Sequence, residues 1–203
     1  MYQKKELDYS TLEPYISDRT LYIHYNNYYL KNLKKLNDIL NKENYNYKYD
    51  KEDLFKHIDL FNIANRDDII YNLGGVINHE LYFNSVSNLG NNKPILEIKK
   101  EIEKKYGTYE NFVQEFKKMA LNLKGSGYTY LVLNKNKELQ IISMSNEESP
   151  YLYDMIPIIA LDMYEHAYYL DYQNNKEKYI DSFFHIIDFK KINKLYEKEK
   201  NKI

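Results

Sequence analysis

The sequence contains no cysteine and no tryptophan, and its 203 residues include only six glycines and four prolines. The absence of cysteine excludes disulfide bonds, thiolate metal sites and cysteine nucleophiles. Any bound metal ion must therefore be held by nitrogen and oxygen atoms. No segment approaches the roughly 20 apolar residues that a membrane-spanning helix needs, so we expect no membrane partner.

Neither sign of charge is in excess, since 29 Lys and Arg stand against 30 Asp and Glu. Because no basic cluster carries interleaved aromatic residues, the sequence does not favour a nucleic-acid partner. The first residues, Met1 to Glu6, lead into no apolar segment like those of secretory signals, and we therefore expect a cytoplasmic protein. Hydrophobic residues make up 43% of the chain, which is enough for a compact core.

Two long helices are predicted in the first part of the chain. Apolar and aromatic residues at helical spacing indicate a helix over residues 17–42, with Ser17 or Asp18 as its N-cap. A polar, tyrosine-rich stretch follows at 43–53, and a second helical pattern covers 66–86. Two such helices joined by a connection of this length predict a helical hairpin.

The turn-forming segment 88–94 separates this hairpin from the rest of the chain. We place a domain boundary there, between an N-terminal helical hairpin domain (1–90) and a C-terminal domain (91–203). The predicted fold class is α+β, with a three-stranded antiparallel sheet packed against helices in the C-terminal domain. The predicted C-terminal elements are helices over 95–106 and 109–124, strands over 128–133, 139–144 and 156–161, and further helices from 163 onward.

The chemistry-bearing residues include five histidines, which are His24, His57, His79, His166 and His185. His24 lies in the first predicted helix and His79 in the second. Asp162 and His166 are four residues apart, so that a carboxylate at the end of a strand and an imidazole in the following helix can converge on one ion. This spacing by itself is weak support for a metal site.

The run Leu-Asp-Met-Tyr-Glu-His-Ala-Tyr-Tyr-Leu-Asp-Tyr-Gln-Asn over residues 161–174 is similar to the signature of the iron/manganese superoxide dismutase family. Further segments resemble the family in the same order along the chain, so that the similarity spans almost all of it. These segments are 12–16 with 23–24, 72–79, 125–128 and 146–150. The resemblance implies an oxidoreductase that converts superoxide into dioxygen and hydrogen peroxide.

The resemblance also implies the metal ligands, which are His24, His79, Asp162 and His166. Three imidazoles and one carboxylate suit iron or manganese, whereas calcium takes more oxygen ligands and structural zinc a closed tetrahedron. We therefore expect one iron or manganese ion per chain. The choice between the two metals stays open.

Three candidate catalytic residues, Tyr28, Asn32 and Glu147, differ from the usual pattern of the family. Tyr28 and Asn32 follow His24 at one and two helical turns, so we expect them on its face of the helix. They stand where the family usually has a gate histidine and a tyrosine. Tyr28 could replace the lost hydroxyl in part or could only fill the core.

Gly75 precedes His79 by one turn and leaves a space beside the expected metal. In the family a glutamine fills this space, supplied from the position of Gly75 or from that of Glu147. A glutamate there could stay protonated, become a ligand or turn away. Two alternative functions therefore remain: a metal-binding homologue without dismutase activity that has a structural or interaction role, and a peroxidase-like redox enzyme.

The resemblance further implies a homodimer with Glu165, Tyr169 and Ser126 at its interface, although a tetramer is also consistent with the family. Lys124 replaces the usual pocket phenylalanine. Phe83, Tyr128 and Tyr164 stand where tryptophans commonly line the pocket. His57 and His185 match no ligand position, and we interpret both as structural or surface residues.

Overall fold

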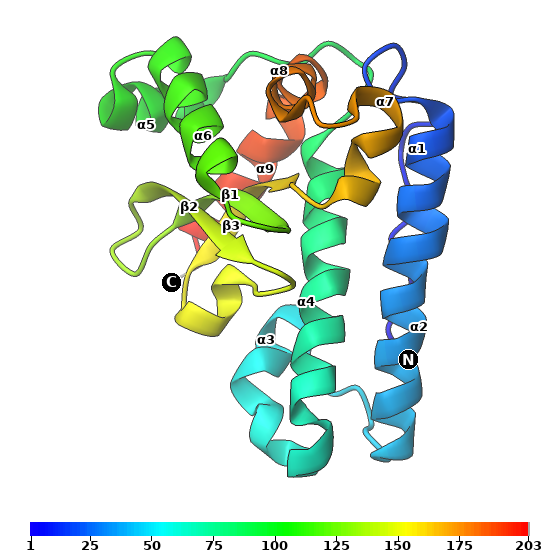
Figure 1. The fold of residues 1–203 in the computed structure, drawn as a ribbon. Helices are drawn as coiled ribbons and strands as arrows, with labels where there is room; N and C mark the ends of the chain where they lie inside the picture. Colours follow the sequence, from blue (N-terminus) through cyan, green and yellow to red (C-terminus); the bar gives the residue numbers. More distant parts are fainter. Residues whose placement is uncertain (203) are drawn as a thin grey trace.

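The computed structural model describes residues 1–202. Two long helices stand side by side, and the sheet with the remaining helices packs against the second of them (Figure 1). The predicted α+β class, with an N-terminal helical hairpin and a three-stranded antiparallel sheet, is confirmed. The exact boundary between residues 90 and 91 stays a prediction. Across the described chain no helix is long and apolar enough to cross a membrane.

The first long helix is not regular along its length. It comprises α1 (Asp18–Ile23), the π-helix η1 (His24–Tyr29) and α2 (Leu30–Lys42). Ser17 caps it as predicted, since its hydroxyl accepts a hydrogen bond from the Thr20 amide at 3.2 Å. The π-helical turn was not predicted, because hydrophobic spacing does not resolve one widened turn. Such turns are frequent at functional sites, and this one begins at His24.

The second long helix, α4 (Ile63–Ser85), begins three residues before the predicted start at Arg66. Asn62 caps it by accepting a hydrogen bond from the Ala64 amide. The connection also contains the short helices α3 (Lys51–Leu54) and η2 (Phe55–Leu60), which the sequence did not predict. Helices of one or two turns show no clear hydrophobic period, so they escape that type of prediction.

The sheet has the strand order β2-β1-β3, so that β1 (Gly127–Leu133) lies in the centre. The strands β2 (Leu139–Ser145) and β3 (Ile156–Asp162) flank it, both antiparallel to it. The register of β1 and β3 shifts next to Pro157, which lacks an amide hydrogen for the ladder. At the other end of β3, Asp162 pairs with Tyr128. The sheet thus delivers the Asp162 carboxylate to the edge that faces α4.

Helices surround the sheet and close the core. The helices α4 and α9 pack on β3, and α6 packs on β2. His166 lies in a single 3-10 turn rather than in a regular helix. The helices of the C-terminal part are α5 (Leu96–Tyr106), α6 (Tyr109–Asn122), η3 (Pro150–Tyr153), η4 (Glu165–Ala167), α7 (Tyr169–Tyr172), α8 (Lys176–Ile186) and α9 (Phe189–Lys200).

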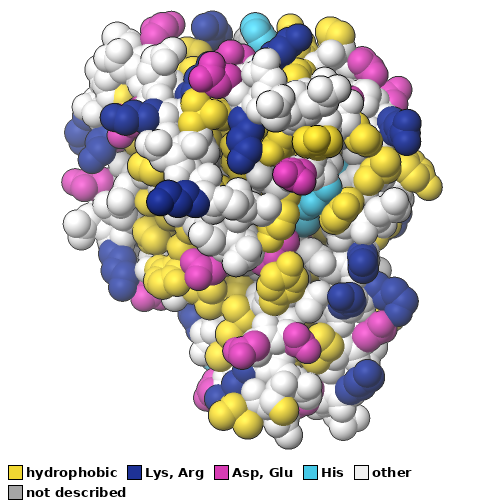
Figure 2. Space-filling model, in the orientation of Figure 1, with side chains coloured by type: hydrophobic (Ala, Val, Ile, Leu, Met, Phe, Trp, Pro, Cys, Tyr) yellow, Lys and Arg dark blue, Asp and Glu magenta, His cyan; other side chains and the backbone are white. Residues whose placement is uncertain are grey.

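One buried cluster joins both parts of the protein. It contains Leu36 of the hairpin, Leu73 of α4, Ile159 of β3 and Phe183 of α8, all of them inaccessible to solvent. Charged side chains of both signs are scattered among hydrophobic ones on the face shown in Figure 2. No single-sign patch dominates that face, in keeping with the balanced composition.

A buried ion pair fastens α3 to α4 directly beside His79. Lys51 Nζ lies 2.5 and 2.6 Å from the two oxygens of the Glu80 carboxylate, and both side chains are about 85% buried. The Tyr29 hydroxyl donates to the same carboxylate at 2.8 Å. A carboxylate buried to this extent depends on its partner, because removal of one charge leaves the other without compensation.

We predict that Lys51→Met lowers the free energy of unfolding of the metal-free protein by about 2–3 kcal/mol in urea titrations. The matched control is Lys34→Met. Lys34 pairs with Asp38 at a similar distance, but both side chains are more than half exposed. This control should change stability by less than about 0.5 kcal/mol. Equal losses in the two variants would contradict the role given to burial.

Candidate metal centre

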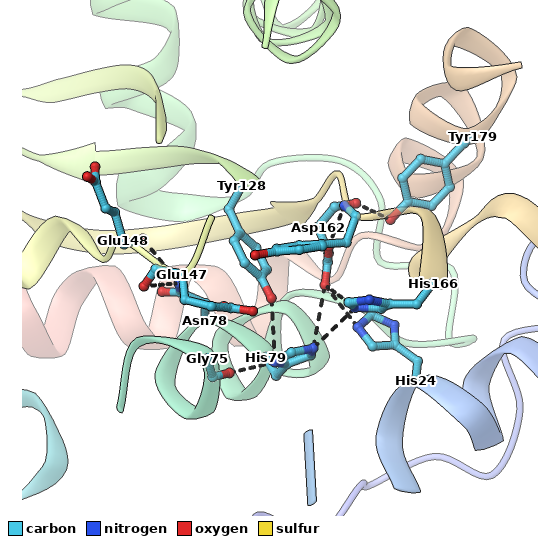
Figure 3. Close-up of polar contacts among 11 residues, drawn as sticks. His24, Gly75, Asn78, His79, Tyr128, Glu147, Glu148, Asp162, His166 and Tyr179 are labelled. Carbon is cyan, nitrogen blue, oxygen red and sulfur yellow. Dashed lines mark hydrogen bonds and ion pairs between the residues drawn. The ribbon is translucent and has the colours of Figure 1, made fainter. Parts of the chain in front are cut away.

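Four side chains from four different elements meet between the hairpin and the sheet. They are His24 of η1, His79 of α4, Asp162 at the end of β3 and His166 of η4, as Figure 3 shows. One ligand atom from each residue lies within 4.8 Å of those of the other three. His24, His79 and Asp162 are buried, and His166 is nearly so.

The separations of these atoms fit a metal ion. The Nε2 atoms of His24 and His166 lie 3.0 and 3.3 Å from Oδ2 of Asp162. The Nε2 atom of His79 lies 3.7 Å from the same oxygen and 3.4 Å from Nε2 of His166. Metal bonds of about 2.0–2.2 Å to nitrogen and oxygen place neighbouring ligand atoms about 2.9–3.8 Å apart. The four residues could therefore hold one ion.

Hydrogen bonds outside the cluster orient its members. Nδ1 of His79 donates to the Gly75 carbonyl at 2.5 Å, which leaves the Nε2 lone pair for the cluster. The Tyr164 amide donates to Oδ1 of Asp162 at 2.8 Å, so that Oδ2 remains for the imidazoles. The Tyr179 hydroxyl donates to the Asp162 carbonyl at 2.7 Å. No sequence signal marked Tyr179, because it lies outside the 161–174 run and is one of many tyrosines in the chain.

Burial sets the protonation of the cluster. It lowers the pKa of His79 to about 3. It also lowers the pKa of His24, although the neighbouring Asp162 opposes this effect. Burial by itself would raise the pKa of Asp162, but His166 and His24 hold it well below its usual range. His24 and His79 are therefore neutral and Asp162 is ionised at pH 7, the states in which these groups bind metals.

Tyr28 and Asn32 both reach the neighbourhood of this cluster. The ring of Tyr28 lies nearly parallel to that of His166, with the ring centroids 3.9 Å apart, and 41% of Tyr28 remains exposed. Asn32, which is partly buried, directs its side chain toward Gly75 of α4. The two residues therefore have different surroundings: Tyr28 covers a cluster histidine, whereas Asn32 fills the space beside Gly75.

Glu147 lies next to the cluster but is not one of its four members. Its side chain is buried, and its Oε2 atom has no hydrogen-bond partner among the described residues. Burial, followed by the charge of Asp162, raises the pKa of Glu147 to about 8, although the facing hydroxyls of Tyr164 and Tyr128 oppose the shift. In the metal-free protein Glu147 is therefore mostly protonated at pH 7. Figure 3 shows Glu148, in contrast, directed away from the histidines.

Aromatic side chains enclose the cluster. The rings of Phe83 and Tyr82 lie 5.0 and 4.9 Å from that of His24, and Tyr164 lies 5.1 Å from His166. The Tyr128 hydroxyl is 3.4 Å from Nδ1 of His79. Of these residues only Tyr82 was missed by the sequence analysis, since no pattern separated it from the other tyrosines of the core.

The remaining residues singled out in the sequence lie elsewhere. His57 stacks on Tyr49 at 3.8 Å and His185 stacks on Tyr15 at 4.8 Å, so neither belongs to the cluster. Three further residues, all predicted at an interface, are accessible to different degrees. Glu165 and Tyr169 are exposed, and Ser126 is partly buried. Lys124 is exposed as well.

Comparison with known proteins agrees with this geometry. Residues 1–87 match the family described as "Iron/manganese superoxide dismutases, alpha-hairpin domain". Residues 94–195 match "Iron/manganese superoxide dismutases, C-terminal domain". The chain belongs to the iron/manganese superoxide dismutase family. The two matches confirm the family predicted from the 161–174 run, and together they cover nearly the whole chain.

The chain is similar to relatives named as iron, manganese or manganese/iron enzymes. The iron superoxide dismutase 3 of Arabidopsis thaliana, a chloroplastic protein, is 36% identical over 180 residues, which cover 88% of this chain and 68% of the relative. The manganese superoxide dismutase of Listeria ivanovii is 33% identical over 95% of both chains. A manganese/iron superoxide dismutase 2 of Staphylococcus aureus is 33% identical over 95% of this chain and 94% of the relative.

We predict a pH-dependent stability difference that depends on Glu147. In the metal-free protein its pKa rises from 4.5 to about 8 on folding. Folding therefore favours the protonated group, and this contribution is complete below pH 4.5 and is lost as the pH rises toward 8. Relative to Glu147→Gln, the free energy of unfolding of the unmodified protein should fall by up to about 1.4 kcal/mol per pH unit across this window.

The matched control for this experiment is Glu148→Gln, which removes the neighbouring but exposed carboxylate. Its stability should follow that of the unmodified protein between pH 5 and 8 within about 0.5 kcal/mol. Urea unfolding of the metal-free proteins at several pH values provides the measurement. A constant difference between Glu147→Gln and the unmodified protein at all pH values would show that Glu147 is ionised in the fold.

Proposed function

We propose that the protein is a superoxide dismutase with one iron or manganese ion per chain, held by His24, His79, Asp162 and His166. The observation that carries this proposal is the convergence of three imidazole nitrogens and one carboxylate oxygen at metal-binding separations. The presence of this cluster in a chain of the dismutase family supports it. Imidazole and carboxylate ligands suit iron and manganese.

A bound iron or manganese ion would supply the one-electron oxidation and reduction that superoxide disproportionation requires. The chain's own residues prepare the site for it. The Gly75 carbonyl keeps the His79 proton on Nδ1, and the Tyr164 amide occupies one Asp162 oxygen, so the remaining atoms face a common point. The ionised Asp162 offsets one positive charge of the ion, while the neutral imidazoles offset none.

Glu147 and Tyr28 would govern the surroundings of the substrate. Superoxide is an anion, so a protonated Glu147 avoids the repulsion that an ionised carboxylate beside the site would cause. Tyr28 covers His166 and limits access from its exposed side. We assign Glu147 and Tyr28 as residues that touch the reacting species.

We further propose a cytoplasmic homodimer. Glu165 and Tyr169 are exposed and flank the nearly buried His166, so that a partner surface could reach this ligand. Leu170 and Tyr22 are also exposed large hydrophobic residues, and burial of such groups favours association. The proposed interface comprises Glu165, Tyr169 and Ser126.

The first test concerns metal binding. Manganese or iron at about 100 times its Kd should raise the Tm of the metal-free protein by roughly 5–10 °C, because a ligand that binds only the folded state stabilises it. His79→Gln should abolish most of this rise. The matched controls are His57→Gln and His185→Gln, which remove histidines outside the cluster and should retain it. Loss of the metal-induced rise in all three variants would refute the assignment.

The second test concerns catalysis. Iron-loaded and manganese-loaded protein is assayed for superoxide consumption, and at least one form should be active. Glu147→Gln should raise activity by roughly tenfold, because the amide carries no charge that repels superoxide. Bound metal without superoxide consumption by either form would instead favour the metal-binding homologue without dismutase activity.

A further inference from the structure

The space that Gly75 leaves in α4 is already filled by another residue. A Cβ atom at position 75 would overlap the amide nitrogen of Asn32 and would lie 2.9 Å from its Cγ. Such short contacts do not occur in folded proteins, so any side chain at position 75 must displace Asn32. The side chain of Asn32 therefore stands where the first atoms of residue 75 would be.

The position that a Cβ atom of residue 75 would take is also in contact with Glu147. The Cδ atom of the Glu147 carboxyl would be 3.3 Å from a Cβ atom at position 75. The amide of Asn32 from α2 and the carboxyl of Glu147 from the segment after β2 thus meet over Gly75. Oε2 of Glu147 is buried and has no hydrogen-bond partner in residues 1–202. The amide of Asn32 is therefore near a carboxyl group that lacks a partner.

We propose that Asn32 is a positioning residue, which occupies the space left by Gly75 and holds the Glu147 carboxyl beside the metal centre. Asn32, Gly75 and Glu147 then act as one unit, and Asn32 restricts position 75 to glycine. This inference rests on the proposed function only where it concerns the effect of Glu147 on the metal centre. The contact itself can be tested on metal-free protein without any superoxide assay.

The neighbouring Gly74 provides a matched control with a different steric limit. A Cβ atom at position 74 would overlap the backbone carbonyl oxygen of Glu147. No side-chain substitution relieves a clash with the backbone, whereas truncation of Asn32 would relieve the clash at position 75. The two adjacent glycines of one helix therefore respond differently to the removal of the Asn32 amide.

The first experiment is a double-mutant cycle on metal-free protein, read as Tm. Gly75→Ala alone should lower Tm by roughly 3–10 °C, because the new methyl group displaces Asn32. In the Asn32→Ala background the same substitution should be neutral or should raise Tm, because alanine favours the interior of a helix over glycine. Gly74→Ala should lower Tm equally in both backgrounds. Additive effects of Gly75→Ala and Asn32→Ala would overturn the proposed contact.

The second experiment separates positioning from simple packing. Asn32→Leu keeps the size of the side chain but removes the amide, and the midpoint potential of the bound metal is measured. If Asn32 holds Glu147, Asn32→Leu should shift this potential when Glu147 is present and leave it unchanged in the Glu147→Ala background. Equal shifts in both backgrounds, or none in either, would overturn the positioning role.

Failure of the proposed function and failure of the Asn32 inference give different results. A protein that binds metal but consumes no superoxide would refute the proposed function, while a non-additive unfolding cycle would still support the contact of Asn32 with Gly75. An active dismutase with an additive cycle would refute the inference alone.

Discussion

Asp162 carries an ionised carboxylate that is fully buried, and three imidazole Nε2 atoms lie within 3.7 Å of its Oδ2 atom. An isolated buried charge of this kind costs several kcal/mol, so it must be compensated by hydrogen bonds, by a cation or by both. Part of the compensation comes from a distant part of the chain, since His24 precedes Asp162 by 138 residues, and part comes from the nearby Tyr164 amide, which donates to Oδ1. The hairpin and the end of β3 must both be in place before this carboxylate is stable, so the fold and the site depend on each other.

Close packing around α4 also fixes the positions of Asn32 and Glu147, which lie next to the four-residue cluster. The helix runs between the first long helix and the sheet, and its buried face includes Gly74, Gly75 and His79. The two glycines let the segment that carries Glu147 approach from one side and Asn32 from the other. A larger residue in either place would push one of these groups outward. Glu147 consequently sits in an environment that favours its protonated form, and it does so without belonging to the four residues that converge.

Much of the fold could be predicted from the sequence because its signals are local. Hydrophobic spacing placed the two long helices, and short apolar runs, two of them joined by a polar turn, placed the three strands within about one residue of their observed ends. The errors have physical causes. The π-helical turn at His24 differs from an α-helical turn by one residue, which a hydrophobic pattern does not resolve. The short helices at 51–60 are too brief to show a period, and they are held by tertiary contacts such as the Lys51–Glu80 ion pair.

For the site, the sequence by itself determined the order of the α+β elements and the identity of the four residues that converge, since the run around Asp162 and His166 is specific and His24 and His79 follow from the same resemblance. Only the tertiary structure decided how the departures from the family pattern are accommodated. It placed Tyr28 on His166, turned Asn32 into the space over Gly75 and buried Glu147 beside tyrosine hydroxyls. The sequence gives the type of each side chain directly. The space beside a glycine and the polarity around a carboxyl group depend instead on which distant segments pack against them.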